Sequence, residues 1–511
     1  MSWPPFPAGP QGWAAHAAAL QAAARAFATG TVAREGRPAP AATPAAVAAA
    51  VAGLEPLPEA GVGLEAALDE VAATVVAGSV DPTHPACAAH LHCPPLISAL
   101  AGEAVAAAVN ASLDSWDQGA AGTAVEGQVV AELCRLVGWG SRADGVFTPG
   151  GTQSNLMGLL LAREWAVRAD LGWDVTTHGL PPAPGRYRIL CSDAAHFSLS
   201  RAASVLGLGE RAVVAVPTDA GACLNPEALE ETLDALERGG ARPLAVVATA
   251  GTTDFGSIDP LPQIVACLRP RKIWLHVDAA YGGAVLLSER HRHLLDGLAG
   301  ADSVAIDFHK LGWQPVACGV FLVRDGASFA PLTRRVAYLN PADDEALGYH
   351  SLLGKSLQTT RRADALKLLV TFRALGRRAL GGMVEQCLGL ARYAASRVAA
   401  EPRLEAPHRP TLSTLVFRYL PADLDRADAV NAAARLALLA SGKAVVGRTE
   451  VAGRVHLKLT FLNPGATPAD VDTLLDAVLD AATSAEHQSP TKDHPPLPLW
   501  GSGVRGEGAI T

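Results

Sequence analysis

A lysine stands between two apolar runs in the segment SVAIDFHKLGWQPVACGVFLV, which spans residues 303 to 323. Lys310 follows the first run, at the end of a predicted strand. An ammonium group held away from water loses proton affinity, and the resulting amine is a nucleophile that can form a Schiff base with a carbonyl compound. The alternative, a lysine with a buried stem and a solvated head, fits less well because both flanks are strongly apolar. We therefore interpret Lys310 as a reactive amine.

An acid occupies the same kind of position in WLHVDAAYGG, residues 274 to 283. Asp278 ends a predicted strand among small residues, where its carboxylate could pair with a protonated ring nitrogen in a charge-assisted hydrogen bond of roughly 1.5 to 3 kcal/mol. The competing interpretation is a helix-capping aspartate, which is common at strand ends. Taken alone, the segment favours the cap.

A glycine-rich turn lies in FTPGGTQSNLMGLLLAR, residues 147 to 163, between a predicted strand and an apolar helix. Backbone N–H groups at the start of that helix, together with Thr152 and Gln153, could hold a phosphate. The Gly-Lys-Ser/Thr ending of the Walker motif is absent. An ordinary strand-to-helix turn explains the segment about as well as a phosphate site does.

Short apolar runs alternate with helical stretches between about residues 120 and 330, and they must position these groups. Continuous apolar strands that alternate with helices predict a mostly parallel sheet covered on both faces. Ligands bind such sheets at the carboxyl ends of the strands, so we expect Asp278 and Lys310 at one site. The predicted strands are residues 145–147, 187–193, 211–217, 243–250, 272–280, 303–309 and 317–323.

The flanking regions predict smaller elements. Ala-rich stretches at residues 13–30 and 45–75 predict N-terminal helices. An apolar helical face over residues 366–375 leads to a C-terminal region with predicted strands at 414–420 and 454–462.

We expect four parts along the chain. Residues 1–110 form an N-terminal helical segment that contributes to a dimer, and residues 111–375 form the large domain. Residues 376–484 form a small C-terminal domain. The tail over residues 485–511 is rich in Pro, Gly and polar residues and is expected to be disordered.

The composition limits the possible partners. A chain of 511 residues that is 49% hydrophobic and 18% charged can bury a large core. A formal net charge of -8 gives no reason to expect nucleic acid or an anionic membrane as a partner. Neither a signal peptide nor an apolar run of about 18 residues is evident. We expect a small-molecule substrate and a cytoplasmic protein.

The eight cysteines are scattered and form no CxxC pair, which argues against a structural zinc site and a disulfide scaffold. His84, His90 and His92 lie close together, but only Cys87 and Cys93 stand near them to complete a ligand shell. We expect no metal site and reduced thiols.

In combination, these segments resemble the group II amino-acid decarboxylases that depend on pyridoxal phosphate (PLP), a family that includes glutamate, aromatic amino acid and 2,4-diaminobutyrate decarboxylases. The HVDAAYGG and DFHK blocks stand in the family's order and spacing, with SDAAHFSLSRAA (192 to 203) upstream. Matching blocks run from DPTHPACAAHLHCPP (81 to 95) to LKLTFLNP (457 to 464). The resemblance implies PLP as cofactor and an α/β architecture of PLP fold type I, like aspartate aminotransferase. Such a fold has a large, mostly parallel seven-stranded sheet domain, a smaller C-terminal α/β domain and N-terminal helices.

The resemblance also implies the cofactor contacts. Lys310 would be the Schiff-base lysine, Asp278 the partner of the pyridine nitrogen, and His196 the imidazole stacked over the ring. The residues alone would make His196 an ordinary histidine in a strand-to-helix loop. The remaining implied contacts are Gly151, Thr152, Gln153 and His309 at the phosphate, Thr253 near the phenolic oxygen and substrate carboxylate, and Ala280 under the ring.

Family decarboxylases carry a loop tyrosine that protonates the substrate carbon after carbon dioxide leaves. ALGYHSLLGKSLQTTRRADALK (346 to 367) matches the exit of that loop, so Tyr349 is the expected acid and Tyr338 the alternative. Many relatives clamp the substrate carboxylate with an arginine where this chain has Lys458, which lacks the planar bidentate fork. His92 and Cys93 are expected beside Lys458 in the substrate site.

The implied reaction is decarboxylation of an L-amino acid to the amine and carbon dioxide. HLHCPP, SWDQGAAGT, GGTQSN, DFHK and GKSLQTTRR look most like the 2,4-diaminobutyrate decarboxylase branch. Asp117 and Glu126 are candidate acids for a second amino group, with surface or capping roles as the alternative.

Three other readings of the function stay open. The substrate could instead be an aromatic or acidic amino acid. The chemistry could be aldehyde formation, carbon-sulfur cleavage or transamination, or the protein could bind the cofactor without turnover. For all of the catalytic readings, the resemblance implies a homodimer with composite active sites, whose walls include residues 81–123.

Overall fold

The computed structural model describes residues 6–488 of the chain. Contacts between these residues divide the chain into two compact units. The site unit consists of residues 91–392 and 408–415, and the terminal unit consists of residues 6–90, 393–407 and 416–488.

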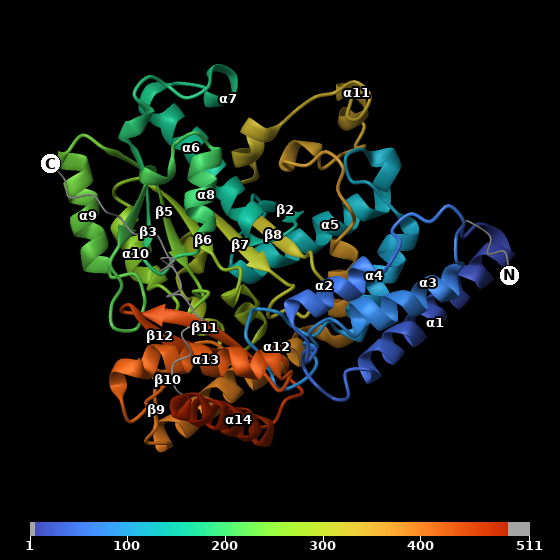
Figure 1. Ribbon diagram of the computed structural model, residues 1–511. Helices are drawn as coiled ribbons and strands as arrows, with labels where there is room; N and C mark the ends of the chain where they lie inside the picture. Colours follow the sequence, from blue (N-terminus) through green and yellow to red (C-terminus); the bar gives the residue numbers. More distant parts are fainter. Residues whose placement is uncertain (1–5, 489–511) are drawn as a thin grey trace. The chain divides into compact units, whose positions relative to one another are not determined.

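The site unit is built on a seven-stranded sheet with the order β2-β8-β7-β6-β5-β3-β4 (Figure 1). Strand β8 runs antiparallel to both of its neighbours, β2 and β7. The other neighbouring pairs are parallel. The mostly parallel seven-stranded sheet expected from the sequence is therefore confirmed. Its strands are β2 (Asp144–Thr148), β3 (Tyr187–Ser192), β4 (Val213–Val216), β5 (Arg242–Thr249), β6 (Trp274–Asp278), β7 (Ser303–Asp307) and β8 (Gly319–Val323).

The strands β6 and β7 are buried along their whole length. Their apolar sequences suit this position, because a parallel sheet with helices on both faces offers no solvated side. Since β5, β6 and β7 are mutually parallel, their carboxyl ends meet at the same edge of the sheet. Asp278 ends β6, and Lys310 stands three residues after Asp307, which ends β7.

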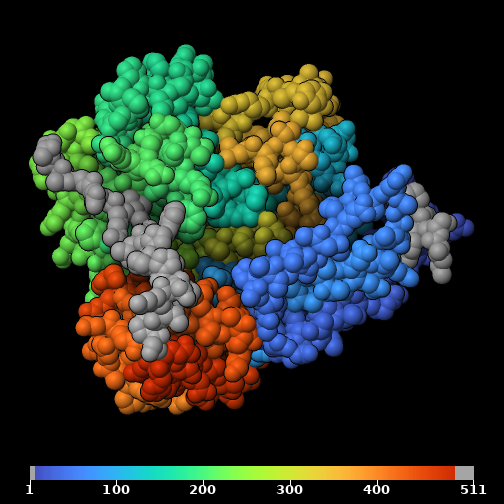
Figure 2. Space-filling model, in the orientation of Figure 1, coloured from blue at the N-terminus to red at the C-terminus, as the bar shows by residue number. Residues whose placement is uncertain are grey.

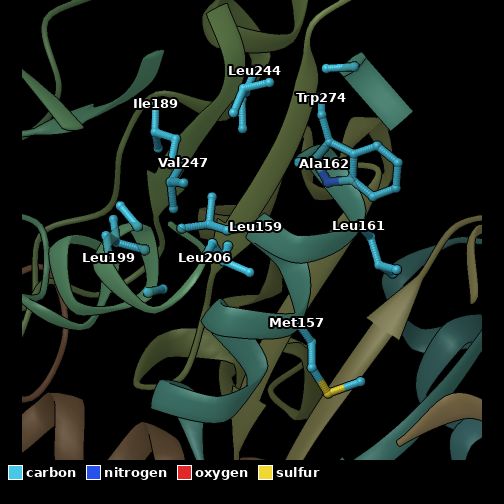
Figure 3. Close-up of a cluster of buried hydrophobic side chains, with 14 of the residues drawn as sticks. Met157, Leu159, Leu161, Ala162, Ile189, Leu199, Leu206, Leu244, Val247 and Trp274 are labelled. Carbon is cyan, nitrogen blue, oxygen red and sulfur yellow. The ribbon is translucent and has the colours of Figure 1, made fainter. Parts of the chain in front are cut away.

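The helix α6 (Gly151–Leu171) contacts β5, β6, β7 and β8, and it also contacts α8 (Ser198–Val205). A cluster of buried apolar side chains joins α6 and α8 to the sheet (Figure 3). Full burial of each large aliphatic side chain contributes roughly 1.5 to 3 kcal/mol. The start of α6 is thereby fixed against the sheet. The cluster includes Met157, Leu159 and Leu161 of α6, Leu199 of α8, and Ile189, Val247 and Trp274 of the strands.

The remaining α-helices of the site unit connect and flank the strands. The apolar helix predicted over residues 366–375 forms the start of α12, which is interrupted at Gly376. Gly376 has a φ of 72°, a conformation that glycine adopts without a steric penalty. These helices are α4 (Ile97–Val109), α5 (Trp116–Val137), α7 (Val175–His178), α9 (Pro226–Arg238), α10 (Leu261–Leu268), α11 (Ala342–Ala346) and α12 (Ala365–Ala400), of which α12 continues into the terminal unit.

The terminal unit contains the N-terminal helices and most of a five-stranded sheet with the order β1-β11-β12-β10-β9. The Ala-rich stretches form helices, as predicted, and two strands match predicted runs, β10 (Thr414–Tyr419) and β12 (Arg454–Thr460). Three strands had not been predicted, because β1 (Cys87–Ala88) and β9 (Leu404–Glu405) are two residues long and β11 (Val445–Val451) is interrupted by polar residues. The helices are α1 (Gly9–Val32), α2 (Pro44–Ala52), α3 (Leu64–Val71), α13 (Ala427–Ala440) and α14 (Pro468–His487).

The domain boundaries predicted near residues 110, 375 and 484 remain predictions. The last helix begins with a capping box, in which Thr467 and Asp470 satisfy each other's backbone N–H groups. It ends at His487, so the first residues of the predicted tail, 485–487, are helical. The rest of that predicted tail, from residue 489, lies outside the described residues.

Within residues 6–488, every helix is too short or too polar to cross a lipid bilayer. All eight cysteines fall in this range, and none forms a disulfide. The described part of the chain contains no cluster of three or more His, Cys, Asp or Glu side chains arranged to hold a metal ion.

Candidate active site

A cavity of about 560 Å³ lies in the site unit at the carboxyl ends of β5, β6 and β7. The last residues of these strands, Thr249, Asp278 and Asp307, line it together with the start of α6. The structure brings together every residue that the resemblance placed at the cofactor. These are Gly151, Thr152, Gln153, His196, Thr253, Asp278, Ala280, His309 and Lys310.

Lys310 lies in the turn that follows β7, and its side chain is 20% exposed. Its Nζ atom is 3.3 Å from Oδ2 of the buried Asp307. The same Oδ2 accepts a hydrogen bond of 3.1 Å from the backbone N–H of Gly151. The Asp307 carboxylate therefore links the lysine turn to the start of α6.

Asp278 is 7% exposed and lines the cavity, and it also makes the local backbone contact expected of a capping aspartate. Its Oδ1 atom accepts a 3.1 Å hydrogen bond from the backbone N–H of Ala280, as a capping aspartate would. Its Oδ2 atom accepts a 2.7 Å hydrogen bond from the side-chain amide of Asn155. Both carboxylate oxygens of Asp278 therefore accept hydrogen bonds, which holds the group in a fixed orientation at the cavity wall.

His196 lines the cavity one residue before Phe197, with the two ring centroids 4.3 Å apart. Its Nδ1 atom lies 2.9 Å from the hydroxyl of Ser198 and accepts a 3.3 Å hydrogen bond from the backbone N–H of Ser198. Burial lowers the pKa of His196, although the nearby Asp278 carboxylate acts in the opposite direction. A neutral imidazole that accepts at Nδ1 carries its proton on Nε2.

Donors for a phosphate surround the first turn of α6. The side-chain Nε2 of Gln153 is buried and has no hydrogen-bond partner among the described residues. His309 accepts at Nδ1 from the backbone N–H of Cys318 at 3.1 Å, which leaves its Nε2–H for an acceptor, and burial lowers its pKa. A side chain at Gly150 would place its Cβ 3.1 Å from the His309 ring, so glycine keeps this turn open.

The lining of the cavity fits PLP. The unpartnered Gln153 amide and the helix start suit a phosphate, since buried donors without acceptors are rare in folded proteins. Asp278 offers a carboxylate for a protonated ring nitrogen, and Lys310 offers an amine for the aldehyde.

The predicted loop tyrosines lie outside this cavity. Tyr349 is 49% exposed and contacts Trp116 edge-on, with ring centroids 6.2 Å apart. Tyr338 is 81% exposed. Neither residue lines the cavity within this chain, so the identity of the loop acid stays a prediction.

The three predicted substrate residues are also outside the cavity lining. Cys93 is buried, donates from Sγ to the carbonyl oxygen of His309 at 3.2 Å, and has its pKa raised to about 12 by burial. His92 is on the surface of the site unit, whereas Lys458 is buried in β12 of the terminal unit. Their roles at the substrate stay predictions.

Neither candidate acid for a second amino group lines the cavity. Glu126 is buried and accepts hydrogen bonds from the backbone N–H of Phe147 at 3.0 Å and from Arg361 at 3.2 Å. Asp117 is exposed and accepts from the Ser115 hydroxyl at 2.5 Å at the start of α5. The surface role named as the alternative fits Asp117, whereas Glu126 has neither a surface nor a capping position and binds Phe147 and Arg361 in the interior.

Sequence reasoning missed several residues of the lining. Asp307 ends a strand as Asp278 does, so the same criterion of an acid at a strand end would have found it. Asn155 lies in the glycine-rich segment, but only the fold shows that it meets Asp278. Arg201 and Leu357 also line the cavity and carry no distinguishing signal in the sequence.

Comparison with known proteins agrees with this site. Residues 55–420 match the family model described as the pyridoxal-dependent decarboxylase conserved domain. The L-2,4-diaminobutyrate decarboxylase of Rhizobium meliloti is 45% identical over 434 residues, which is 85% of this chain and 85% of that protein. The L-2,4-diaminobutyrate decarboxylase of Acinetobacter baumannii is 39% identical, over 83% of this chain and 84% of that protein.

A solved structure of a related decarboxylase has a similar fold. It is described as the glutamate decarboxylase domain of diaminobutyrate-pyruvate transaminase and L-2,4-diaminobutyrate decarboxylase from Vibrio parahaemolyticus. It matches with a TM-score of 0.85 and 36% identity, over 94% of this chain and 98% of that chain. The chain belongs to the pyridoxal-dependent decarboxylase family, and it is a PLP-dependent amino-acid decarboxylase of fold type I.

Proposed function

We propose that this enzyme decarboxylates L-2,4-diaminobutyrate to 1,3-diaminopropane and carbon dioxide. The observation that supports this substrate most strongly is the 45% identity to the Rhizobium meliloti enzyme over 85% of both chains. The cavity supports the reaction itself, because Lys310, Asp278 and His196 all line it.

The residues of the cavity would divide the work of holding the cofactor. Bound PLP supplies an electron sink for the electron pair that carbon dioxide leaves behind. Lys310 would hold the cofactor through Nζ, and the Asp278 carboxylate would keep the pyridine nitrogen protonated. The neutral His196 would orient the cofactor and substrate from one face, with Ala280 packing against the other. Gly151, Thr152, Gln153 and the Nε2–H of His309 would bind the phosphate, and Thr253 would lie near the substrate carboxylate.

Tyr349 would return a proton to the substrate carbon from which carbon dioxide has left. Its phenol lies outside the cavity of its own chain, so it must reach the carbon by movement of the loop or come from a partner subunit. His92, Cys93 and Lys458 would complete the substrate site in the same assembly. General acid catalysis of this kind accelerates a step by about 10² to 10⁴.

We further propose a cytoplasmic homodimer with composite active sites. Several helices expose large apolar side chains that a second copy of the chain could cover. Figure 2 shows the N-terminal helices, in blue, as part of the exposed surface. These side chains include Trp13 and Phe27 of α1, which are 63% and 60% exposed, and Ile97 and Val109 of α4, which are 85% and 64% exposed.

One lining residue favours a second candidate substrate. Arg201 lines the cavity, and a guanidinium there could bind the side-chain carboxylate of an acidic amino acid in a bidentate pair. Its position 4.9 Å over the Phe197 ring gives it an alternative partner within the chain. An acidic L-amino acid is therefore the second candidate substrate.

The test is a panel of L-amino acids incubated with purified protein and PLP. The panel contains diaminobutyrate, ornithine, lysine, glutamate, aspartate, cysteine sulfinate, tryptophan and tyrosine, and both carbon dioxide and the amine are quantified. We expect 1,3-diaminopropane as the main amine, with kcat/KM for diaminobutyrate at least about 10-fold above the next substrate. A higher kcat/KM for glutamate, aspartate or cysteine sulfinate would replace the proposal with the acidic alternative.

A further inference from the structure

A continuous chain of buried hydrogen bonds leads from the cavity wall into the core of the sheet. Trp274, His276 and Asp278 alternate along β6 and therefore project from the same face of the sheet. The indole Nε1 of Trp274 donates to the Ser303 hydroxyl at 2.9 Å, and that hydroxyl lies 2.8 Å from Nδ1 of His276. Nε2 of His276 lies 3.0 Å from Oδ1 of Asn155, whose Nδ2 donates to Asp278 at 2.7 Å.

The two ends of this chain fix the direction of every bond in it. The indole of Trp274 can only donate, and the ionised carboxylate of Asp278 can only accept. The Ser303 hydroxyl, which accepts from the indole, is thus free to donate to Nδ1 of His276. The imidazole then donates from Nε2 to the Asn155 oxygen, and the amide nitrogen of Asn155 donates to Asp278. Every proton in the chain points towards the carboxylate.

Asn155 also serves a branch that ends at His196. Its Nδ2 atom donates a second hydrogen bond, of 2.9 Å, to the Ser198 hydroxyl. Because Ser198 accepts from Asn155, its own proton is directed to Nδ1 of His196 at 2.9 Å. The imidazole of His196 is thereby held with its proton on Nε2.

The packing around the chain leaves little freedom for its members. Asn155 is 1% exposed, and His276, Ser198 and Ser303 are fully buried. Gly158, one turn after Asn155 on α6, lets the helix approach the His276 ring: a Cβ there would lie 2.7 Å from Nδ1. Burial lowers the pKa of His276 to about 4, so the ring is neutral at neutral pH and matches the bond directions above.

We propose that Asn155 is a positioning residue that couples the two groups facing the cofactor ring, holding Asp278 as an ionised carboxylate and His196 as the Nε2–H tautomer. The buried His276 supports it from behind by donating to the Asn155 oxygen. This inference rests on the proposed role of Asp278 at the pyridine nitrogen. Asn155 does not make the contact to the pyridine nitrogen itself. It donates a hydrogen bond to the Asp278 carboxylate, which is proposed to make that contact.

The experiment measures the protonation state of the cofactor ring directly. Apoprotein is loaded with PLP that carries ¹⁵N in the pyridine ring, and the ¹⁵N chemical shift reports whether that nitrogen is protonated. The dissociation constant of PLP is measured on the same proteins. We expect a protonated nitrogen in the wild type, and in Asn155→Leu a shift towards the unprotonated position with PLP binding weakened by about 10-fold or more.

A pair of variants at His276 covers the case in which Asn155→Leu fails to fold. Glutamine can place its side-chain N–H near the position of the histidine Nε2–H, whereas leucine fills similar space and donates nothing. We expect His276→Gln to retain the protonated ring nitrogen and His276→Leu to lose it. Equal loss in the two variants would contradict the proposal.

Val277→Ala is the matched control, because Val277 is fully buried in the same strand and its side chain projects from the opposite face. Val277→Ala should keep the ring nitrogen protonated. If this control loses the proton as well, general packing explains the effect and the inference about Asn155 is wrong.

Asp278→Asn distinguishes failure of the inference about Asn155 from failure of the proposed role of Asp278. If Asp278→Asn loses protonation while Asn155→Leu keeps it, the inference about Asn155 is wrong and the role of Asp278 stands. If Asp278→Asn also keeps it, the proposed role of Asp278 is wrong as well.

Discussion

The two parts of this enzyme that should take part in the reaction differ in burial and in hydrogen bonding. The cofactor wall comprises the ends of β6 and β7 and the start of α6, and its Asp278, Asp307 and Asn155 side chains are buried and linked by hydrogen bonds to neighbouring groups, such as Asn155 to Asp278. The tyrosine segment, residues 333–351, exposes Tyr338 and Tyr349 to solvent. The groups that are proposed to hold the cofactor lie in the packed part of the site unit, and the proposed proton donor lies on a solvent-exposed segment.

Lys310→Ala should have the largest effect, because it removes the amine that holds the cofactor in the cofactor wall. We expect complete loss of the visible absorbance of covalently bound PLP and loss of decarboxylation. Absorbance spectroscopy and carbon dioxide release check this on purified protein. An unchanged spectrum would show that another lysine carries the cofactor.

Asp278→Asn tests the other end of the cofactor wall. The amide is neutral and can no longer stabilise a protonated ring nitrogen, although it keeps the size of the side chain. We expect partial retention of PLP and a kcat lower by on the order of 10²- to 10³-fold. Near-normal turnover would leave Asp278 with a structural role only, through its bonds to the Ala280 N–H and to Asn155.

Tyr349→Phe tests the tyrosine segment and should spare the cofactor wall. PLP binding should match the wild type, because the phenol lies outside the cavity lining. The substrate carbon that has lost carbon dioxide would be protonated slowly, so the amine yield should fall while oxygen consumption, aldehyde and ammonia rise. Product analysis under air and under nitrogen measures this shift.

Tyr338→Phe is the control for that assignment, since Tyr338 lies on the same segment and is more exposed. It should behave as the wild type. Diversion of products by Tyr338→Phe alone would move the assignment to Tyr338. If neither variant diverts the products, the proton comes from another group, and His196 is the next candidate.

His276→Gln should have the smallest effect, on the acid stability of the cofactor wall. The folded-state pKa of His276 is lowered to about 4, below the ordinary value of about 6.5. Burying the neutral His276 ring therefore gives its full contribution to the free energy of unfolding above pH 6.5. That contribution is lost as the pH falls towards 4, by up to about 1.4 kcal/mol per pH unit. Glutamine does not titrate in this range. The drop in thermal midpoint between pH 7.5 and pH 5 should therefore be a few degrees smaller in His276→Gln than in the wild type. An equal drop in the two proteins would contradict this account of His276.

The fold of the site unit could be predicted largely from the sequence, because its strands are continuous apolar runs. All seven predicted strands occur in one sheet. In the terminal unit, β11 was missed because it contains Arg448, Thr449 and Glu450, and a strand with polar residues lacks that signature.

The site was predictable to the extent that its residues lie in contiguous blocks. Lys310 and Asp278 stand at strand ends, and a parallel sheet brings such ends together. Asn155 and Asp278 are far apart in sequence, and their hydrogen bond depends on the packing of α6 against β6. Glu126 shows the same limit, because its hydrogen-bond partners, Phe147 and Arg361, lie outside the segment around it.

The lysine that carries PLP can be mapped directly in the wild-type protein. Borohydride reduction fixes the cofactor to its lysine, and trypsin does not cleave after a modified lysine. We expect a phosphopyridoxyl group on Lys310, in one tryptic peptide that spans residues 293–324. Modification of a different lysine, or cleavage after Lys310 in protein that has bound PLP covalently, would contradict this expectation.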